Sequence, residues 1–469
     1  MSLEQTPTTE PSINTTDDYI PSRTKLYKNT NSINWNYTTD FTRDNYNKMK
    51  DASFKFHKSL PDYHPTPLVR IPFNINSANK SVNSANHDTT TATSSSSPYS
   101  EKDIEVYVKM ETSRFNLPSF KMLGTGWGIF KILCLKLGLD YTAASFTDLK
   151  TTINNSKLFP SLTLLACTDG NHGRAVARMA AMLGLPSLII VPRNVLDTEV
   201  AKIESEPGCT VERVQGNYDF AVEYCDLLCG YSESLSLSNF VAGNDNEDGE
   251  MLINVGGNGY VWVQDFGTDN YTEVPVWIAE GYSTICRELP FDPDLIVVPC
   301  GSGCLPHGIT AYFRNSNTNS NTHVMLAEPF TAHCVNKSLT LASASSDSGN
   351  SMTIMDGLNC PTVSSVAWPV LRDGVSFSGL VGELDVVDAV LKLKDDAGLD
   401  VGPCGGISFA ALMNFVGGND DGEDGLLKEL KDLKMKNGDE GPVRVVLLAT
   451  EAGREFSLRE EGEFLKSHL

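Results

Sequence analysis

The sequence predicts a two-domain α/β protein with parallel-rich twisted sheets and flanking helices, and three observations support this. Short apolar runs alternate with helical patterns, as at residues 161–167 followed by 174–185. Several of these runs end in a glycine loop that leads into the next helix, which is typical of parallel sheets. The 469 residues, of which 41% are hydrophobic, can bury two sizeable cores.

The predicted elements follow one another in regular order along the chain. Runs that are typical of strands lie at 104–111, 161–167 and 187–192, and two longer runs that end in glycine loops lie at 294–304 and 443–453. Helical spacing is found at 126–139, where it ends at Gly138, at 174–185, and around 195–206. We therefore expect strands and helices to alternate through most of the chain.

Polar, low-complexity stretches interrupt this pattern. Residues 1–54 are expected to form an N-terminal arm with local structure at most, and the Ser- and Thr-rich segment 77–100 a disordered insert. Further inserts are expected at 244–250, 342–351 and 417–425. We predict a large domain from residues 55–121 and 259–469 and a small domain from residues 122–258.

The net charge and the cysteine content narrow the range of possible partners and sites. A net charge of −22 argues against a nucleic-acid or anionic-membrane partner, so we expect a small molecule as ligand. The N-terminus lacks the marks of a targeting signal, and no apolar run is long enough to span a bilayer. The eleven cysteines form no CxxC pair, so we assign no metal site and expect free thiols in a reducing cytoplasm.

Three glycine loops follow predicted strands, at residues 168–173, 300–304 and 449–453. Ligands bind where parallel strands deliver their ends to helix N-termini. In "CGSGC", Gly301 and Gly303 let the backbone close around an anion and Ser302 adds a hydroxyl, which would suit a phosphate monoester. A tight strand-to-helix turn explains this loop alone equally well.

Lys121 lies at the start of an apolar helical pattern, between Phe120 and Met122. An ordinary surface lysine at a helix start is the simplest interpretation. The apolar neighbours, however, are expected to lower the pKa of Lys121 and favour the neutral amine that forms a Schiff base. Such a lysine, a phosphate loop and a parallel sheet together predict a pyridoxal 5′-phosphate site.

The chain also resembles a known family. The motifs "YHPTPL" (63–68), "ETSRFNLPSFKMLG" (111–124), "TDGNHGRAVA" (168–177), "NYTEVPVWIAEGYSTI" (270–285), "MDGLNC" (355–360) and "WPVLRDG" (368–374) occur in the order found in diaminopropionate ammonia-lyases. These are threonine dehydratase-like, fold type II pyridoxal-phosphate enzymes related to the tryptophan synthase beta chain. The resemblance covers roughly residues 55 to 455.

The resemblance implies a role for each matched residue. Lys121 would bind the cofactor covalently and then act as a base, and Asn171 would hydrogen-bond the phenolic oxygen of the cofactor. The remaining matched positions would hold phosphate (Gly301, Ser302, Gly303 and Cys304), the pyridine nitrogen (Thr450), the substrate carboxylate (Thr168, Asp169 and Gly170) and the substrate side chain (Asp265). For Asp265, a solvated loop aspartate is nearly as plausible, and for Thr450 a strand-end threonine that packs its methyl group.

The implied reaction is α,β-elimination of 2,3-diaminopropionate to pyruvate and two ammonia. Asp169 would face the substrate Cα from the side opposite Lys121, so one site could process both enantiomers. A carboxylate that caps the loop is the alternative for Asp169. Relatives are dimers, so we expect a homodimer. Cys334 and Cys360 match cysteines in relatives, so the two residues are expected to be close in space as free thiols.

Departures from the family pattern leave other functions open. Pro118 and Ser119 in "LPSFK" are nearer the pattern of the wider dehydratase group, and "TDNYT" lacks an aromatic and an acidic residue that the family carries there, so a serine/threonine dehydratase or a racemase is an alternative. Pro403 stands where relatives carry Glu, and this change also permits a cofactor-binding regulatory protein without turnover. The intact set of Lys121, Asp169 and Asn171 argues against that last possibility.

Overall fold

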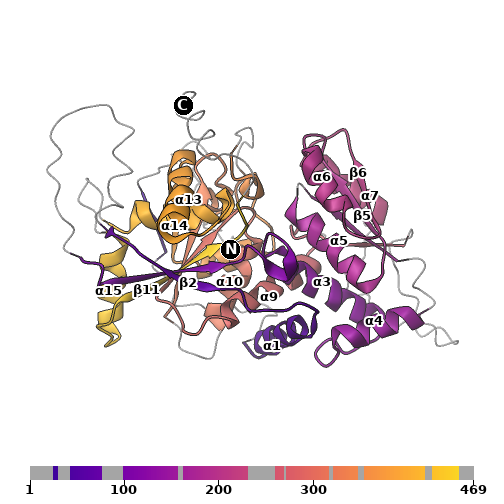
Figure 1. Cartoon of the computed structure of the whole chain (residues 1–469), viewed down its shortest axis with the longest axis horizontal. Coiled ribbons are helices and arrows are strands. Elements are labelled where there is room, and N and C mark those ends of the chain that lie inside the picture. The colour runs from indigo at the N-terminus through magenta and orange to yellow at the C-terminus, as the bar shows by residue number, and fades with distance from the viewer. Residues whose placement is uncertain are drawn as a thin grey trace, which may run out of the picture.

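The computed structural model describes residues 25–29, 43–75, 99–156, 162–168, 170–230, 259–268, 271–315, 321–346, 353–417 and 425–453. The chain forms a larger body around a seven-stranded sheet and a smaller body around a four-stranded sheet (Figure 1). Nearly all of the predicted inserts at 77–100 and 417–425, all of 244–250, and part of 342–351 lie outside the described residues. Residues 43–54 of the predicted arm belong to helix α1 (Arg43–Ser59).

The seven-stranded sheet has the order β1-β10-β9-β8-β11-β3-β2. Its strands are β1 (Tyr27–Lys28), β2 (Leu68–Ile71), β3 (Ile104–Met110), β8 (Leu295–Pro299), β9 (His323–Pro329), β10 (Phe377–Val381) and β11 (Val443–Ala449). The two edge strands pair antiparallel and the five between them pair parallel. Strands β8, β9 and β10 are buried along their whole length, as expected where helices cover both faces of a parallel sheet.

Helices accompany this sheet in the pattern predicted from the sequence. They are α9 (Glu273–Arg287), α10 (Cys304–Asn315), α11 (Cys334–Leu341), α12 (Trp368–Gly374), α13 (Glu383–Ala397), α14 (Pro403–Phe415) and α15 (Leu426–Lys436). Helix α14 is buried almost throughout and packs against the central strands.

The four-stranded sheet has the order β6-β5-β4-β7 and is parallel throughout. Its strands are β4 (Thr163–Cys167), β5 (Ser187–Val191), β6 (Cys209–Arg213) and β7 (Tyr260–Trp262), and its helices are α4 (Phe146–Asn155), α5 (Asn171–Leu183), α6 (Asp197–Glu204) and α7 (Tyr218–Cys229). Strand β7 pairs with β4, although the predicted boundary assigned residues from 259 onwards to the large domain. The division into domains stays a prediction.

Helix α3 (Lys121–Lys136) lies between the two bodies and packs on both α9 and α5 (Figure 1). Its contact with α9 requires glycine, because a Cβ on Gly124 would lie 2.5 Å from Cε1 of Tyr282. Lys121 is the first residue of this helix, as the sequence pattern indicated. The lysine is therefore held where the two bodies meet.

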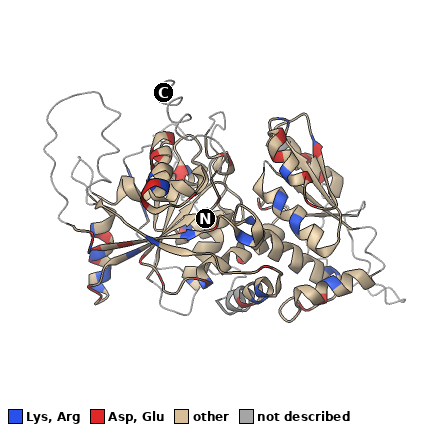
Figure 2. Cartoon of the chain, in the orientation of Figure 1, with Lys and Arg blue, Asp and Glu red and all other residues tan. Residues whose placement is uncertain are grey.

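Acidic and basic residues are interspersed on helices such as α13 and α15 (Figure 2). Within the part of the chain that the structure describes, no helix has the length and apolar character needed to cross a membrane.

Candidate active site

The loops that follow several parallel strands meet at the start of α3. The residues brought together are Lys121 at the first position of α3, Asn171 and His172 at the start of α5, Asp265 after β7, the run from Gly301 to Cys304 between β8 and α10, and Thr450 after β11. Lys121 and His172 both lie close to Asp265, the carbonyl of Thr450 accepts a hydrogen bond from the residue before Lys121, and Cys304 is near enough to act on the pKa of Lys121. Asp169, which was predicted as a second base, lies outside the described residues.

Lys121 forms an ion pair with Asp265. The lysine Nζ lies 2.6 Å from Oδ2 of the carboxylate, and Asp265 is only 9% exposed. Burial alone would lower the pKa of Lys121, but the Asp265 carboxylate outweighs burial and the pKa lies above its ordinary value. The predicted lowering of this pKa is therefore wrong for the protein without its cofactor. The apolar neighbours Phe120 and Met122 are buried, yet the Asp265 carboxylate decides the direction in which the pKa of Lys121 shifts.

The same ion pair also sets the charge of Asp265. Burial would raise the pKa of this carboxyl, but His172 and Lys121 hold it well below the usual range. The loop of Asp265 is fixed by its neighbours, since the Gln264 side chain accepts a hydrogen bond from Cys167 N and its backbone N–H bonds the Tyr271 hydroxyl. The carboxylate is therefore charged and held in place.

His172 lies beside this pair, although sequence reasoning gave it no catalytic role. Its Nε2 donates to the backbone carbonyl of Val263 at 2.9 Å. Its Nδ1 lies 3.7 Å from Oδ2 of Asp265 and 3.4 Å from Oγ1 of Thr125. Burial lowers the pKa of His172, Asp265 acts in the opposite direction, and Lys121 lowers it further. The imidazole is thus electrostatically coupled to the Lys121–Asp265 pair.

The segment after β11 runs beside the residues that precede Lys121. Ser119 and Glu451 form an isolated antiparallel bridge, and Phe120 N donates to Thr450 O at 3.4 Å. This pairing places Thr450 next to the lysine that begins α3. The Thr450 hydroxyl is buried and has no hydrogen-bond partner in the described structure. A buried hydroxyl without a partner is costly unless a ligand supplies one.

Glu451 is a site residue that sequence reasoning missed. Its Oε2 accepts a hydrogen bond from Nδ2 of Asn171 at 3.3 Å, and its Oε1 accepts from Cys404 N at 3.2 Å. The carboxylate therefore joins the start of α5 to the N-terminus of α14. Pro403 occupies the first position of α14, where a missing N–H costs no helical hydrogen bond, so this departure from relatives fits the fold. An acidic residue two positions after the end of a buried strand was the available signal.

The glycine loop between β8 and α10 is closely packed. Gly303 has φ +102°, a conformation that favours glycine, and an added Cβ would lie 2.7 Å from Cδ1 of Leu371. Ser364, which was also missed, accepts from Gly267 N through its hydroxyl and donates its backbone N–H to Ser302 O. Ser364 therefore connects the loop of Asp265 to the glycine loop.

Cys334 and Cys360 both contact this glycine loop. The thiol of Cys334 lies 3.7 Å from Gly301 O, and a Cβ built on Gly301 would lie 3.0 Å from Sγ of Cys360. Neither of these two cysteines is in a disulfide bond within the described structure. Their expected proximity is consistent with this shared neighbour.

The loop after β4 is organised by Thr168. Its hydroxyl accepts a hydrogen bond from Gly170 N at 2.9 Å, and the residue is 2% exposed. An added Cβ on Gly170 would meet no atom within 4 Å, so the N-terminus of α5 opens onto free space. Backbone N–H groups at a helix N-terminus suit a carboxylate.

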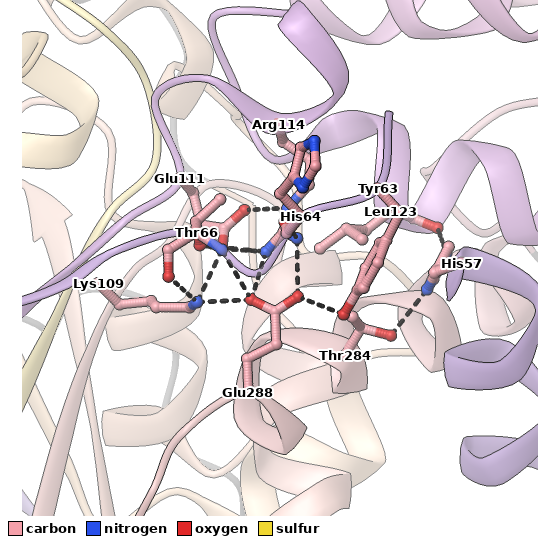
Figure 3. Close-up of polar contacts among 10 residues, drawn as sticks. All are labelled: His57, Tyr63, His64, Thr66, Lys109, Glu111, Arg114, Leu123, Thr284 and Glu288. Carbon is pink, nitrogen blue, oxygen red and sulfur yellow. Dashed lines mark hydrogen bonds and ion pairs between the residues drawn. The ribbon is translucent and has the colours of Figure 1, made fainter. Parts of the chain in front are cut away.

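A buried ionic network supports the segment that leads to Lys121 (Figure 3). Arg114 forms two hydrogen bonds with the carboxylate of Glu111, at 2.6 and 2.9 Å, and two with that of Glu288, at 2.7 and 2.8 Å. Lys109 binds the same Glu288 at 2.5 Å, and Tyr63 donates to it at 2.8 Å. The two cations and the two carboxylates therefore neutralise one another, and all four groups are shielded from solvent.

This network holds a strained turn. Phe115 and Asn116, in the short helix η3 (Arg114–Asn116), have φ values of +52° and +60°, a left-handed conformation that non-glycine residues rarely adopt. Burial would lower the pKa of Arg114, but the two carboxylates raise it above its ordinary value, so the guanidinium stays charged. The turn fixes the direction in which the chain reaches Lys121. No sequence signal links Arg114 to Glu288, which is 174 positions away.

Comparisons with known proteins identify the family and the fold of the chain. A family model described as "Pyridoxal-phosphate dependent enzyme" matches residues 86–425. The diaminopropionate ammonia-lyase of Escherichia coli strain K12 is 27% identical over 328 residues, which cover 68% of each chain. A serine racemase of Oryza sativa subsp. indica is 27% identical over 256 residues, 53% of this chain and 62% of the racemase.

The fold matches solved structures over nearly the whole chain. A crystal structure of holo diaminopropionate ammonia-lyase from Escherichia coli has a TM-score of 0.68 and 22% sequence identity, with 96% of this chain and 99% of that chain covered. The predicted fold class, that of fold type II pyridoxal-phosphate enzymes, is therefore confirmed.

Proposed function

Because the chain belongs to the family of pyridoxal-phosphate dependent enzymes, we propose that it eliminates ammonia from 2,3-diaminopropionate, in the D form, the L form or both. The products would be pyruvate and two molecules of ammonia. One observation carries the choice of substrate: the buried carboxylate of Asp265 binds a primary ammonium, that of Lys121, at 2.6 Å. A substrate with a second amino group offers this carboxylate another primary ammonium, which can take the place of the Lys121 ammonium once Lys121 is linked to the cofactor.

The residues at the site fit pyridoxal 5′-phosphate. The Thr450 hydroxyl is buried without a partner, and a pyridine nitrogen would supply one. The loop from Gly301 to Gly303 leads into α10, whose N-terminal amides suit a phosphate. We assign the covalent link to Lys121, the phosphate to residues 301–304, the ring nitrogen to Thr450 and the phenolic oxygen to Asn171. Bound there, the cofactor supplies an electron sink for negative charge at Cα.

The chain's own residues have distinct tasks in this proposal. The backbone of the loop from Thr168 to Gly170 binds the substrate carboxylate and so fixes Cα. Lys121 removes the Cα proton on one face, and Asp169 removes it on the other, so that each enantiomer meets a base. Asp265 orients the β-substituent. Glu451 holds the Asn171 amide at 3.3 Å and so fixes its orientation.

A serine/threonine dehydratase or a serine racemase is the second candidate. The likeness to the rice serine racemase, 27% identical over 256 residues, supports it, as does Ser119 in "PSFK". A hydroxyl β-substituent would also hydrogen-bond Asp265, but it would leave the charge of the carboxylate unpaired. That difference in charge favours the diamino acid.

A product assay separates the two candidates. Pyruvate and ammonia are measured together for D- and L-2,3-diaminopropionate, serine and threonine. Two ammonia per pyruvate, with diaminopropionate as the best substrate, is the expected result. One ammonia per turnover of serine, with no reaction of diaminopropionate, identifies a dehydratase, and inversion of serine without pyruvate identifies a racemase.

Asp265→Asn tests the observation that carries the proposal. The amide keeps the shape of the side chain and loses the charge, so the KM for diaminopropionate should rise more than the KM for serine. An equal rise for both substrates would mean that the carboxylate does not select an ammonium.

A further inference from the structure

We propose that His172 supplies, through Asp265, the proton that a hydroxyl leaving group at Cβ needs. This inference deepens the proposed function and rests on its reaction type. His172 acts through the carboxylate and is thus a positioning residue that sets the protonation of Asp265.

The geometry of the imidazole assigns the two ring nitrogens to different tasks. Nε2 lies 2.9 Å from the carbonyl oxygen of Val263, which can only accept, so Nε2 carries a hydrogen in both the neutral and the charged ring. Nδ1 is then the atom that gains and loses a proton. It lies 3.7 Å from Oδ2 of Asp265 and 3.4 Å from the Thr125 hydroxyl, which can donate to the neutral ring.

Two charged groups face this ring, and they oppose each other. The Asp265 carboxylate favours the protonated imidazole, whereas the Lys121 ammonium disfavours it. In the structure Asp265 is already neutralised by Lys121 at 2.6 Å. Once the Lys121 amine no longer carries its charge, and where the substrate brings no β-ammonium, His172 is the neighbouring group that can neutralise the carboxylate by taking a proton. The ring is 5% exposed, so that proton is shared with Asp265 more readily than with bulk water.

The proton transfer balances as follows. Nδ1–H of His172 passes its proton to the Asp265 carboxylate, and the carboxyl O–H passes a proton to a β-hydroxyl; a β-ammonium already carries the proton that it needs. The Cβ–O bond then breaks with both electrons staying on oxygen, and water leaves. The electron pair left by removal of the Cα proton forms the Cα–Cβ double bond. The base that took the Cα proton returns it to solvent, and the imidazole takes a proton back from solvent after product release.

The chemistry of the leaving group provides the first test. A hydroxyl leaves only after it gains a proton, whereas chloride leaves without one and a β-ammonium already carries its proton. His172→Gln keeps an amide N–H that can reach Val263 O and removes the titratable nitrogen. We expect kcat to fall by roughly 10²-fold with serine, the usual effect of losing a positioned proton donor, and by less than about threefold with β-chloroalanine and diaminopropionate. An equal fall for all three substrates overturns the proposal.

His57 offers a matched control. It is also fully buried, with Nε2 2.8 Å from a backbone carbonyl, that of Leu123, and Nδ1 2.7 Å from a hydroxyl, that of Thr284. The Asp265 carboxylate does not contribute to its pKa. His57→Gln should therefore affect chloride and hydroxyl leaving groups to the same extent. A selective loss with the hydroxyl in this variant would show that the leaving-group pattern is a packing effect.

The second test needs no turnover. In the cofactor-free protein, the imidazole pKa of His172 is measured by nuclear magnetic resonance with labelled histidine. Lys121→Met removes the opposing ammonium, so this pKa should rise, and adding Asp265→Asn should lower it again. A pKa that is the same in all three proteins overturns the coupling.

The two proposals can fail separately. If the wild-type protein does not react with diaminopropionate, the proposed substrate is wrong, but the comparison of serine with β-chloroalanine still tests His172. If diaminopropionate is the substrate and His172→Gln slows all leaving groups equally, the proposed function stands and the role of His172 falls.

Discussion

The Nζ atom of Lys121 lies 2.6 Å from Oδ2 of Asp265, although the two residues are 144 positions apart. Lys121 begins α3, and Asp265 follows β7 of the four-stranded sheet. The ion pair therefore closes the site across two different parts of the fold. It also keeps the lysine charged, because the nearby carboxylate outweighs the effect of burial on the pKa of Lys121. Binding of the cofactor to Lys121 has to replace this ion pair.

Lys121→Ala should abolish both the covalent attachment of pyridoxal phosphate and turnover. The wild-type protein should absorb visible light and, after borohydride reduction, carry the cofactor on the peptide that contains Lys121. Lys136, on the same helix, is the informative competitor, because burial lowers its pKa to about 8 and gives it a larger share of neutral amine. Mass spectrometry that finds the reduced cofactor on Lys136 would refute the assignment.

The strands, loops and helix that form the site were predictable from the sequence, but the direction in which the pKa of Lys121 shifts was not. Apolar runs and glycine loops indicated β8, β11 and the helix at Lys121, since periodicity and turn residues are local properties. The charge on Lys121 depends on Asp265, and the strained turn at Phe115 depends on Glu288. Both partners are far away in the sequence, so only the fold brings them into contact.

Arg114→Met should destabilise the protein strongly. The guanidinium is 1% exposed and binds the carboxylates of Glu111 and Glu288, so its removal leaves two buried carboxylates with a single cation, Lys109. Breaking a buried pair in this way costs about 3–5 kcal/mol in the free energy of unfolding. Urea unfolding of the cofactor-free protein, followed by circular dichroism, measures the loss.

Lys392→Met is the matched control for a surface ion pair. Lys392 and Asp396 lie one turn apart on α13, and their side chains are 34% and 48% exposed. Exposed pairs contribute little, so the free energy of unfolding should change by no more than about 0.5 kcal/mol. If Arg114→Met has an equally small effect, the network in Figure 3 does not stabilise the turn before Lys121.

Buried histidines should make the protein sensitive to acid. Burial lowers the pKa of His307 to about 4, so between the ordinary value of about 6.5 and 4 the unfolded chain binds a proton that the folded protein does not. The stability from the neutral ring is fully present above pH 6.5 and is lost as the pH falls through this window, by up to about 1.4 kcal/mol per pH unit. Urea titrations at several pH values measure this slope.

His307→Leu isolates the contribution of this one group. The variant removes a titratable ring on α10 and should reduce the slope of the unfolding free energy between pH 6.5 and pH 4, whatever its stability at pH 7. His323, whose pKa is also about 4, still titrates in the variant, so part of the slope remains. An unchanged slope would show that His307 is protonated in the folded protein.

The surroundings of Asp169 support a test of its proposed role as the second base. The flanking residues are well placed, since Thr168 fixes Gly170 N at 2.9 Å and the start of α5 opens onto free space. Asp169→Asn keeps the size and hydrogen-bonding capacity of the side chain and removes its basicity. Any capping of the loop should survive this change, whereas proton abstraction should not.

The two enantiomers of the substrate are each other's control in this variant. If Lys121 serves one face of Cα and Asp169 the other, activity on one enantiomer, which we expect to be D, should fall by roughly 10²–10⁴-fold, the range for a lost general base. Activity on the other enantiomer should change little, because Lys121 is untouched. Initial rates of pyruvate formation from each enantiomer, at equal cofactor occupancy, give the ratio. If the ratio of D to L activity is unaltered, Asp169 caps the loop and a single base serves the site, which would make a dehydratase the better description of the reaction.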